Sequence, residues 1–409
     1  MKKDWKQLLG DILGTLFILA VGSGVTLFAS LIAFMGIVPL YVAKVTPIVL
    51  GFGVLYLALM IWVKQPAAGK IKKGYLAIVL VCVVFVGFSF GYDLYLKSVP
   101  EMEDREGLVF EYTPNAEGTL AVRLEEESTL KFDEVTIRMD GATALYPVYA
   151  AFVQAVSPDR VYDPWDYSYE SKDGLNTITC SGTNMAYERL IRGDTDIIFV
   201  GGPSDAQLAM AKAAGVELHL TPIGREAFVF FVNSENPVTG LTVEQIQKIY
   251  TGEITNWHQV GGKFQKILPY QRAENSGSQT ALQRLMEGLP LMEPKKEERI
   301  GGMGGIITSV ANYRNFKNAI GFSFRFYSTE MVRNDQIRLL ALNGVEPTVD
   351  TIRDGTYPIA NSFYAVTASP IGQPAPEETN EDLAALIDWI LSEQGQWLIE
   401  ETGYVGIGN

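Results

Sequence analysis

Three long apolar stretches occupy the first hundred residues of the chain. They cover about residues 8–35, 47–63 and 75–96, and each is long enough, or nearly long enough, to cross roughly 30 Å of hydrocarbon as a helix. The middle stretch is the weakest, because two prolines and a lysine between residues 39 and 47 limit its start. The pattern predicts a membrane region with three transmembrane helices over residues 1–97.

The pattern changes after this region. Residues 98–118 are polar and acidic and contain two prolines, which is typical of a linker. Further on, strand-like runs at residues 195–200 and 227–232 alternate with helix-like runs at residues 206–214 and 243–250. Such alternation predicts an α/β fold with a parallel sheet that has helices on both faces.

Lysines around the apolar stretches indicate the orientation of the membrane region. The N-terminus carries three lysines and the loop between the second and third stretches carries four, whereas the loop between the first and second has only Lys44. By the positive-inside rule the lysine-rich segments are cytoplasmic and everything after residue 96 lies outside. A cleaved signal peptide would also begin with lysines, but the first stretch is long, lacks a clear small-x-small cleavage site and is followed by further apolar segments. We therefore expect it to remain as a span.

Charge is divided unequally between the two regions. Residues 1–100 carry nine lysines and three aspartates, a net of +6, so with the whole chain at −14 the remainder carries −20. Contacts to a nucleic-acid backbone need clustered Lys and Arg, so nucleic acid is not expected as a partner. A small anion is not excluded, because local dipoles and neutral donors can hold it whatever the global field.

Cysteine and histidine form no catalytic or metal-binding pattern. The two cysteines, Cys82 in the third apolar stretch and Cys180, have no zinc or iron–sulfur spacing. The two histidines, His219 and His258, do not form a recognisable nucleophile–base pair with Cys180. We expect a protein that is not an enzyme, with no cofactor and no metal site.

Three short turns rich in glycine and hydroxyl groups lead into predicted helices. The most informative, residues 272–278, places Arg272 four positions ahead of a Ser-Gly-Ser sequence, and the turns at residues 140–143 and 180–184 have the same construction. A helix N-terminus offers unpaired N–H groups and a partial positive charge, and hydroxyls and a guanidinium add donors for a tetrahedral anion. Taken singly, such a turn is more often a plain N-cap and such an arginine a solvated surface residue. Together they predict a site for one small oxyanion.

Further motifs extend this pattern to the C-terminus. They lie at residues 236–246, 249–257, 301–306, 319–322, 357–359 and 395–405. In this order and spacing, the sequence from about residue 135 onward resembles the phosphate-binding proteins of phosphate ABC importers, the PstS type of the type II periplasmic-binding-protein superfamily. The resemblance implies an α/β, two-lobe type II periplasmic-binding-protein fold with an inter-lobe cleft, here preceded by the transmembrane α-helical region.

Domain boundaries follow from the same resemblance. Residues 119–409 would form the phosphate-binding-protein-like domain. Lobe one would consist of residues 119–226 and 327–409, and lobe two of residues 227–326. Small ligands are commonly bound in a cleft of this kind, and closure of the lobes excludes water from it.

The resemblance implies a phosphate site made by the three turns and one carboxylate. Its residues are Thr143, Ser181, Asp205, Arg272, Ser276, Gly277 and Ser278. Asp205 has two interpretations, because the segment before it is longer than in the family. Either it accepts the proton of a protonated phosphate and so rejects sulfate, or it only begins the helix at residues 206–214, and Gly201 and Gly202 supply backbone donors instead.

The function implied is that of a membrane-tethered extracytoplasmic substrate-binding protein that captures inorganic phosphate for an ABC importer. Its partners would be phosphate, the permease subunits and membrane lipid. No Walker A sequence is present, so transport energy would come from another subunit. The alternative is a membrane-bound sensor of phosphate or another oxyanion that signals through its transmembrane helices.

Overall fold

The computed structural model describes most of the chain and divides it into two compact units. The described residues are 5–33, 35, 38–63, 67–99, 101–102, 106–134, 136–167, 170–171, 174–293, 299–300, 313–314, 316–331 and 336–407. One unit is Met1–Val99 and the other is Pro100–Asn409. The predicted motif at residues 301–306 lies outside the described residues.

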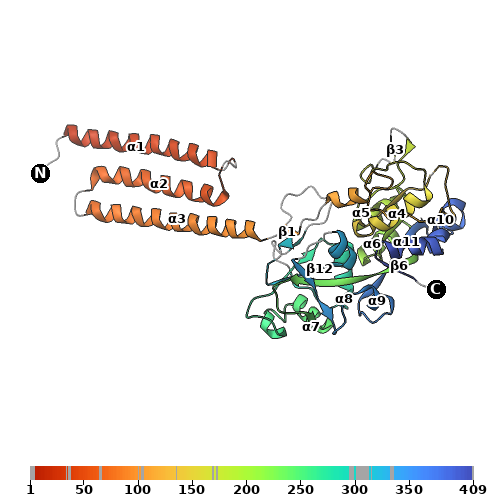
Figure 1. Ribbon diagram of the computed structural model, residues 1–409. Helices are drawn as coiled ribbons and strands as arrows, with labels where there is room; N and C mark the ends of the chain where they lie inside the picture. Colours follow the sequence, from red (N-terminus) through yellow and green to blue (C-terminus); the bar gives the residue numbers. More distant parts are fainter. Residues whose placement is uncertain are drawn as a thin grey trace. The chain divides into compact units, whose positions relative to one another are not determined.

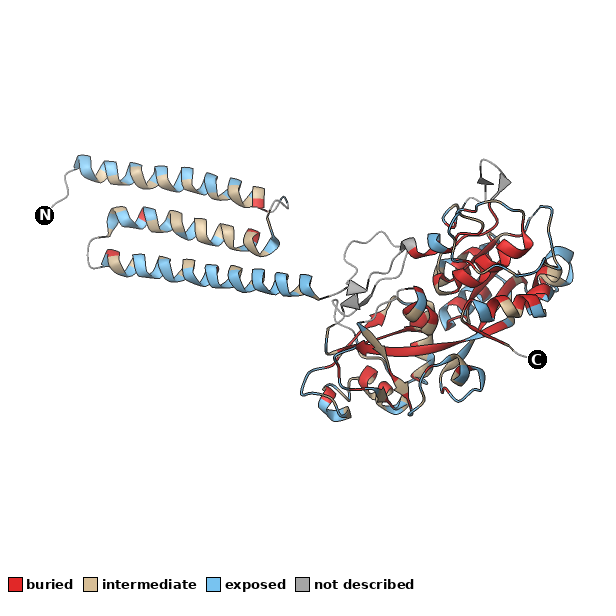
Figure 2. Cartoon of the chain, in the orientation of Figure 1, coloured by how far each residue is buried: buried red, intermediate tan, exposed pale blue. Residues whose placement is uncertain are grey.

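The first unit consists of three long helices that lie side by side (Figure 1). They are α1 (Trp5–Ile32), α2 (Leu40–Trp62) and α3 (Ala67–Ser98), and α2 contacts both of the others. All three are long and apolar enough to cross a membrane, by length and composition. Their large apolar side chains are mostly exposed, as the pale blue ribbon in Figure 2 shows. Helices that are apolar all round and yet exposed suit a lipid environment.

The middle helix differs from its prediction at its start. It begins at Leu40 rather than at residue 47, with Pro39 as N-cap and Pro47 inside the helix. A proline inside a helix removes one backbone hydrogen bond, but transmembrane helices tolerate the loss when neighbouring polar groups compensate. Next to this proline, the Thr46 hydroxyl donates to the Val42 carbonyl at 2.9 Å.

The second unit alternates short helices and strands. Its strands are β1 (Glu101–Met102), β2 (Met139–Gly141), β3 (Glu170–Ser171), β4 (Gly174–Leu175), β5 (Ile197–Gly201), β6 (Val216–Asn233), β7 (Gly240–Leu241), β8 (Leu268–Pro269), β9 (Gln271–Arg272), β10 (Arg299–Ile300), β11 (Tyr313–Arg314), β12 (Ala319–Phe324), β13 (Ile337–Leu339), β14 (Ala341–Leu342), β15 (Ala360–Pro370) and β16 (Val405–Gly406). Its α-helices are α4 (Tyr146–Val156), α5 (Thr183–Arg192), α6 (Asp205–Ala213), α7 (Val243–Thr251), α8 (Gly277–Leu285), α9 (Val349–Arg353), α10 (Glu381–Leu391) and α11 (Glu393–Glu401). Shorter helical turns are η2 (Glu106–Tyr112), η3 (Thr143–Leu145), η4 (Trp257–Val260), η6 (Tyr327–Met331) and η7 (Pro376–Glu378).

A mixed sheet runs through this unit in the order β2-β5-β15-β6-β12-β8, with β13 and β16 also paired to β6. The pairs β2–β5 and β12–β8 are parallel. However, β15 is antiparallel to β5 and β6, and β12 is antiparallel to β6. The prediction of a parallel sheet is therefore wrong at its centre, because β15, which comes from much later in the chain, lies between β5 and β6 and runs antiparallel to both.

Among the described residues, two large hydrophobic cores divide the unit into two lobes, and the buried residues appear in red in Figure 2. The first core contains α4, β5, α10 and α11, and the second contains α7, α8 and β12. The long strand β6 contributes Ile223 to the first core and residues from Ala227 onward to the second. Each lobe thus has its own core, with β6 passing from one to the other.

Packing extends the second lobe beyond its predicted end. Leu340, Leu342 and Ile352 all lie in the second core, although the predicted lobe ends at residue 326. After η6 the chain returns to pair β13 with β6. We therefore propose to add residues 337–360 to lobe two, and the other predicted boundaries remain predictions.

Candidate functional site

A cavity of about 40 Å³ lies between the two lobes. Its lining comes from both lobes: Ala142, Ala144, Leu145, Thr183, Gly201, Gly202, Glu226, Gly277, Ala281, Arg284, Phe324, Asn361, Ser362, Phe363 and Tyr404. The three turns that the sequence singled out each contribute to this lining, and the end of β5 contributes the two glycines. The cavity is thus the place where the predicted anion-binding turns meet.

The first two turns are joined through their backbones. The Gly182 N–H donates to the Gly141 carbonyl at 3.1 Å, and the Thr179 N–H donates to the Met139 carbonyl at 2.9 Å. Gly141 is required at the end of β2, since a Cβ there would lie 2.5 Å from the Phe199 carbonyl oxygen. This close approach sets the start of η3 beside the start of α5.

A buried carboxylate fixes the second turn. Asp140 accepts hydrogen bonds from the Ser181 N–H at 2.8 Å and the Ser181 hydroxyl at 2.6 Å, and from the Gly141 N–H at 2.7 Å. The Arg189 Nε lies 3.0 Å from Asp140 Oδ2. Burial raises the pKa of Asp140, while the Ser181 and Gly141 hydrogen bonds and the Arg189 charge act in the opposite direction. The proton of the Ser181 hydroxyl is therefore directed at Asp140.

The third turn begins α8. Ser276 is its N-cap and accepts a hydrogen bond from the Gln279 N–H at 3.3 Å. The preceding Asn275 has a φ of 62°, which bends the chain from β9 into the helix. A Cβ on Gly277 would lie 3.1 Å from the Thr183 hydroxyl oxygen of the other lobe. The first residues of α5 and α8 thus face each other across the cavity.

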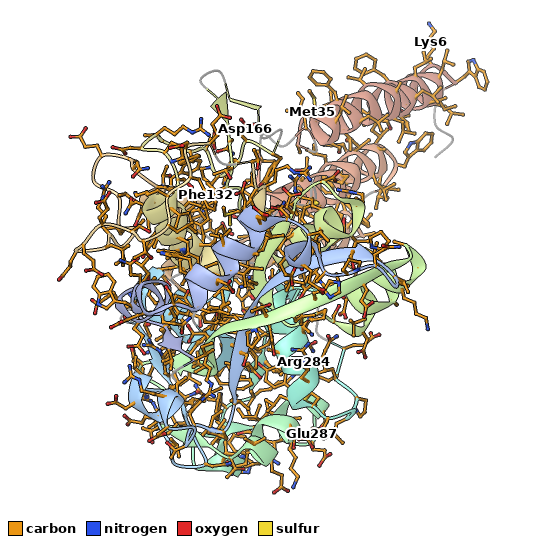
Figure 3. The ribbon with its side chains drawn as sticks, turned by 90° about the vertical axis from the view of Figure 1, so that its right-hand side faces the viewer. Lys6, Met35, Phe132, Asp166, Arg284 and Glu287 are labelled. Carbon is orange, nitrogen blue, oxygen red and sulfur yellow. The ribbon has the colours of Figure 1, made fainter. Side chains whose placement is uncertain are left out.

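Three hydrogen bonds hold the lobes together beside the cavity. The Ser204 hydroxyl donates to Asn275 Oδ1 at 3.0 Å, and the Gln207 amide donates to the Asn275 carbonyl at 3.3 Å. From α8, Arg284 Nη2 donates to the Pro203 carbonyl at 2.6 Å, and Figure 3 shows Arg284 projecting from this helix. The described conformation is therefore one in which the cleft is closed.

The predicted site residues differ in their position relative to the residues that line this cavity. Gly277 lines it, and Thr143 is buried between two lining residues, Ala142 and Ala144. Ser276 and Ser278 flank Gly277, with Ser278 buried. Ser181, with its Asp140 contacts, lies two residues before the lining Thr183. Arg272 is half-buried on β9, and its backbone N–H donates to Gln279 Oε1 at 2.9 Å. These assignments stay predictions.

Asp205 is exposed and is the first residue of α6. It is not among the residues that line the cavity. Its neighbour Ser204 is the N-cap, with a capping box completed by Gln207. Of the two interpretations of Asp205, this position suits the one in which it begins the helix, while Gly201 and Gly202 line the cavity.

Several lining residues were not predicted. Arg284 and Ala281 follow Gly277 by seven and four positions, so the three share one face of α8. That spacing was a signal the sequence offered. Glu226 and Asn361 were not predicted as site residues, although the predicted lobe boundary falls at residue 226 and the motif at residues 357–359 lies just before Asn361, because each is part of a long strand.

Buried titratable groups at the site include Glu226 and Tyr404, which line the cavity, and Cys180 in the second turn. Burial raises the pKa of Glu226 to about 7, although the Arg325 charge and backbone N–H groups act in the opposite direction. Burial likewise raises the pKa of the Cys180 thiol to about 12, so this thiol is neutral near pH 7. Within the described residues, no group of three His, Cys, Asp or Glu side chains could hold a metal ion.

The arrangement can bind a small polar anion. The first turns of α5 and α8 supply backbone N–H groups, and Thr183 supplies a hydroxyl, all at one closed cavity. Arg284, which is itself part of α8, adds a positive charge to the lining of the cavity. Donors of this kind act strongly where water is excluded.

Comparison with known proteins gives the family. A family model described as a PBP superfamily domain matches residues 123–394. The phosphate-binding protein PstS of Borreliella burgdorferi is 27% identical over 191 residues, which is 46% of this chain and 65% of that protein, just under two thirds of its length. PstS of Bacillus subtilis is 27% identical over 274 residues, which is 66% of this chain and 81% of that protein.

A solved structure also aligns with the chain. It is a putative phosphate ABC transporter substrate-binding protein with bound phosphate from Clostridium perfringens, 25% identical, with a TM-score of 0.49, covering 66% of this chain and 99% of that one. The curated relatives are binding proteins, in agreement with the expectation that the chain is not an enzyme. Because the family model covers well over half of the sequence, the chain belongs to the PBP superfamily, and the resemblance to PstS-type binding proteins is confirmed.

Proposed function

We propose that this chain is a membrane-tethered extracytoplasmic binding protein that captures inorganic phosphate between its lobes and delivers it to the permease subunits of an ABC importer. The observation that carries the proposal is the meeting of the starts of α5 and α8 at one closed cavity, each behind a glycine- and hydroxyl-bearing turn. Relatives of this chain are named phosphate-binding proteins. The net negative charge of the region after residue 100 does not prevent anion binding, because the N–H and hydroxyl donors lie next to the anion.

The proposed ligand contacts are those that the motifs imply. They are Thr143, Ser181, Asp205, Arg272, Ser276, Gly277 and Ser278. To these we add Thr183 and Arg284, which line the cavity from opposite lobes. The three apolar helices would tether the binding domain to membrane lipid near the permease.

Calorimetric titration of the full-length chain in detergent micelles tests the ligand. Phosphate, sulfate, molybdate and tungstate are titrated separately. Phosphate is expected to bind at one site per chain and at least about tenfold more tightly than the others. Absence of phosphate binding, or tighter binding of another oxyanion, would reject phosphate as the ligand.

A sensor is the second proposal, favoured by the presence of three apolar helices where one span would suffice as an anchor. Replacing residues 1–97 with a single unrelated span separates the two roles. An importer component should still support phosphate uptake by cells after the exchange. A sensor should lose its phosphate-dependent signal, while the purified protein still binds phosphate.

A further inference from the structure

The loop between β5 and α6, which the sequence predicts to be longer than in the family, reaches lobe two beside the cavity. Its Pro203 carbonyl accepts from Arg284 Nη2 at 2.6 Å, and the Ser204 hydroxyl donates to Asn275 Oδ1 at 3.0 Å. In the first turn of α6, Gln207 Nε2 donates to the Asn275 carbonyl at 3.3 Å. We call these five residues the inter-lobe latch. Each bond joins one protein group to another, so its contribution to closure does not depend on which ligand is bound.

The lobe-one side of the latch is fixed within its own lobe. The Tyr187 hydroxyl of α5 donates to the Gly201 carbonyl at 2.8 Å. The Ser204 N–H donates to Gln207 Oε1 at 2.8 Å, and the Gln207 N–H donates to the Ser204 hydroxyl oxygen at 3.2 Å. These bonds lie inside lobe one, so they can persist when the lobes separate. The latch side chains are therefore already ordered, and little conformational entropy is lost when the latch forms.

On the lobe-two side, the latch holds the third predicted anion-binding turn. Asn275 stands directly before Ser276, the N-cap of α8, and both its backbone and its side-chain oxygen accept hydrogen bonds from lobe one. The Arg284 guanidinium lies against Gly202, where a Cβ would be 3.0 Å from both Nη1 and Nη2. Lobe one thus contacts the start of α8 and one of its later turns.

The glutamine at residue 207 suits the inter-lobe bond and not only the helix cap. A capping box needs an acceptor oxygen at this position, which glutamate offers as well as glutamine does. The bond to the Asn275 carbonyl needs a donor, and an ionised glutamate has none. Only 1% of Gln207 is exposed, so water has little access to replace that bond while the cleft is closed.

We propose that the inter-lobe latch stabilises the closed cleft independently of the ligand contacts and thereby determines how long a bound anion is retained. The identity of that anion as phosphate rests on the proposed function. A ligand enters and leaves through the open cleft, so a bond made only in the closed cleft slows release more than entry. The same bond shifts the ligand-free protein toward the closed state.

Gln207→Glu removes the latch bond and keeps the cap. The glutamate can still accept from the Ser204 N–H, but its other oxygen faces the Asn275 carbonyl and repels it. The control is Gln245→Glu. Gln245 has the same place in the capping box of α7, where it accepts from the Thr242 N–H at 2.9 Å. Within the described part of the chain, its side chain makes no bond to lobe one.

The first measurement is the separation of α6 and α8 in the full-length protein in detergent micelles, after dialysis to remove phosphate. Spin labels are attached at Lys212→Cys on α6 and Leu289→Cys after α8, both exposed positions, and the native cysteines are buried. Because the latch joins these two helices, opening moves the labels apart. Pulsed EPR is expected to show a larger population at long separation in Gln207→Glu than in wild type, and no change in Gln245→Glu.

The second measurement is the release of radiolabelled phosphate into an excess of unlabelled phosphate. Loss of one hydrogen bond from the closed state should make release from Gln207→Glu about fivefold to tenfold faster than from wild type. The association rate should stay within about twofold of wild type, because association begins from the open cleft. Gln245→Glu should release phosphate at the wild-type rate.

The outcomes separate the latch from the proposed function. Wild-type separation and wild-type release in Gln207→Glu would reject the latch. Faster release with unchanged separation would also reject it, because Gln207 would then act on the ligand and not on the lobes. If wild type binds no phosphate, the proposed function fails, while the separation measured without phosphate still tests the latch.

Discussion

Arg272 offers the most direct mutational test of the predicted anion site. It lies on β9, half-buried, with its backbone tied to Gln279 of α8. Arg272→Ala is expected to remove a charge-assisted contact and to cost roughly 1.5–3 kcal/mol of phosphate binding, at least about tenfold in affinity. Arg272→Lys should recover only part of this, because an ammonium group lacks the planar fork. Calorimetric titration with phosphate measures both changes.

The control is Arg192→Ala. Arg192 is exposed on α5 and pairs with Asp194 at 2.9 Å, so its loss should leave phosphate affinity unchanged. Wild-type affinity in Arg272→Ala would mean that the guanidinium does not contact the ligand.

Glu226 also makes stability depend on pH. Its pKa rises from 4.5 in the unfolded chain to about 7 in the folded one, so the folded state holds the proton more firmly. The contribution is fully present below pH 4.5 and is lost as pH rises through 7, roughly 3 kcal/mol at 1.36 kcal/mol per pH unit. Glu226→Gln should therefore be stabilised relative to wild type at pH 8 more than at pH 5.

Thermal unfolding of the binding domain within the full-length protein, at pH 5 and pH 8, measures this difference. Comparing variant with wild type removes the titration of all other groups. An equal effect of the substitution at both pH values would show that Glu226 titrates similarly in the folded and unfolded states.

Site residues could be predicted from the sequence where a turn and its polar side chains lie within a few consecutive residues. Gly277, for example, lies in a Ser-Gly-Ser turn that can be recognised in the sequence, and in the structure Gly277 lines the cavity. Glu226 was not predicted as a residue of the site, because its burial beside the cavity arises where β6 passes from one core to the other. Burial of that kind depends on β12 and β15, which are distant in the sequence.

Strand β2 and the turn after it depend on one glycine. A Cβ at Gly141 would meet the Phe199 carbonyl oxygen at 2.5 Å and the Tyr149 ring at 2.9 Å. Gly141→Ala is expected to destabilise the binding domain by about 1–3 kcal/mol, because strand β5 or the ring must move. Thermal unfolding measures the loss. Gly201→Ala, whose added Cβ would meet nothing within 4 Å, serves as the control, and equal unfolding temperatures for the two variants would contradict the packing argument.

Two predicted helices of the binding domain match the structure closely, whereas the extent of its longest strand was not predicted. The run predicted at residues 206–214 is α6, and the run at residues 243–250 is α7, each with a capping box that the local sequence supplies. In contrast, the predicted run at residues 227–232 covers only the later part of β6, which begins at Val216. Its first half alternates exposed and half-buried positions with Pro222 among them, and pairing with β15 decides its conformation.

The two units have opposite charge and different surfaces. Residues 1–100 carry +6 and the remainder −20, and the three apolar helices expose large side chains that a protein in water would bury. Composition alone predicted this division, because a run of about twenty apolar residues can be recognised without knowledge of the tertiary structure. The boundaries of the two lobes could be found only from the tertiary structure, since residues 337–360 return to the second core.

Orientation in the membrane gives the last prediction. The lysines before the first span and between the second and third place those segments in the cytoplasm by the positive-inside rule, so the domain after residue 96 should be extracytoplasmic. Both native cysteines, Cys82 and Cys180, are buried, so a membrane-impermeant maleimide should label wild type weakly. Phe264→Cys places a thiol at a residue that is 82% exposed and should be labelled in spheroplasts or intact protoplasts. Lys70→Cys, at an exposed position in the first turn of α3, should be labelled only after the cells are lysed. Labelling of Lys70→Cys in intact protoplasts, with Phe264→Cys protected, would invert the topology and make capture of external phosphate by this domain impossible.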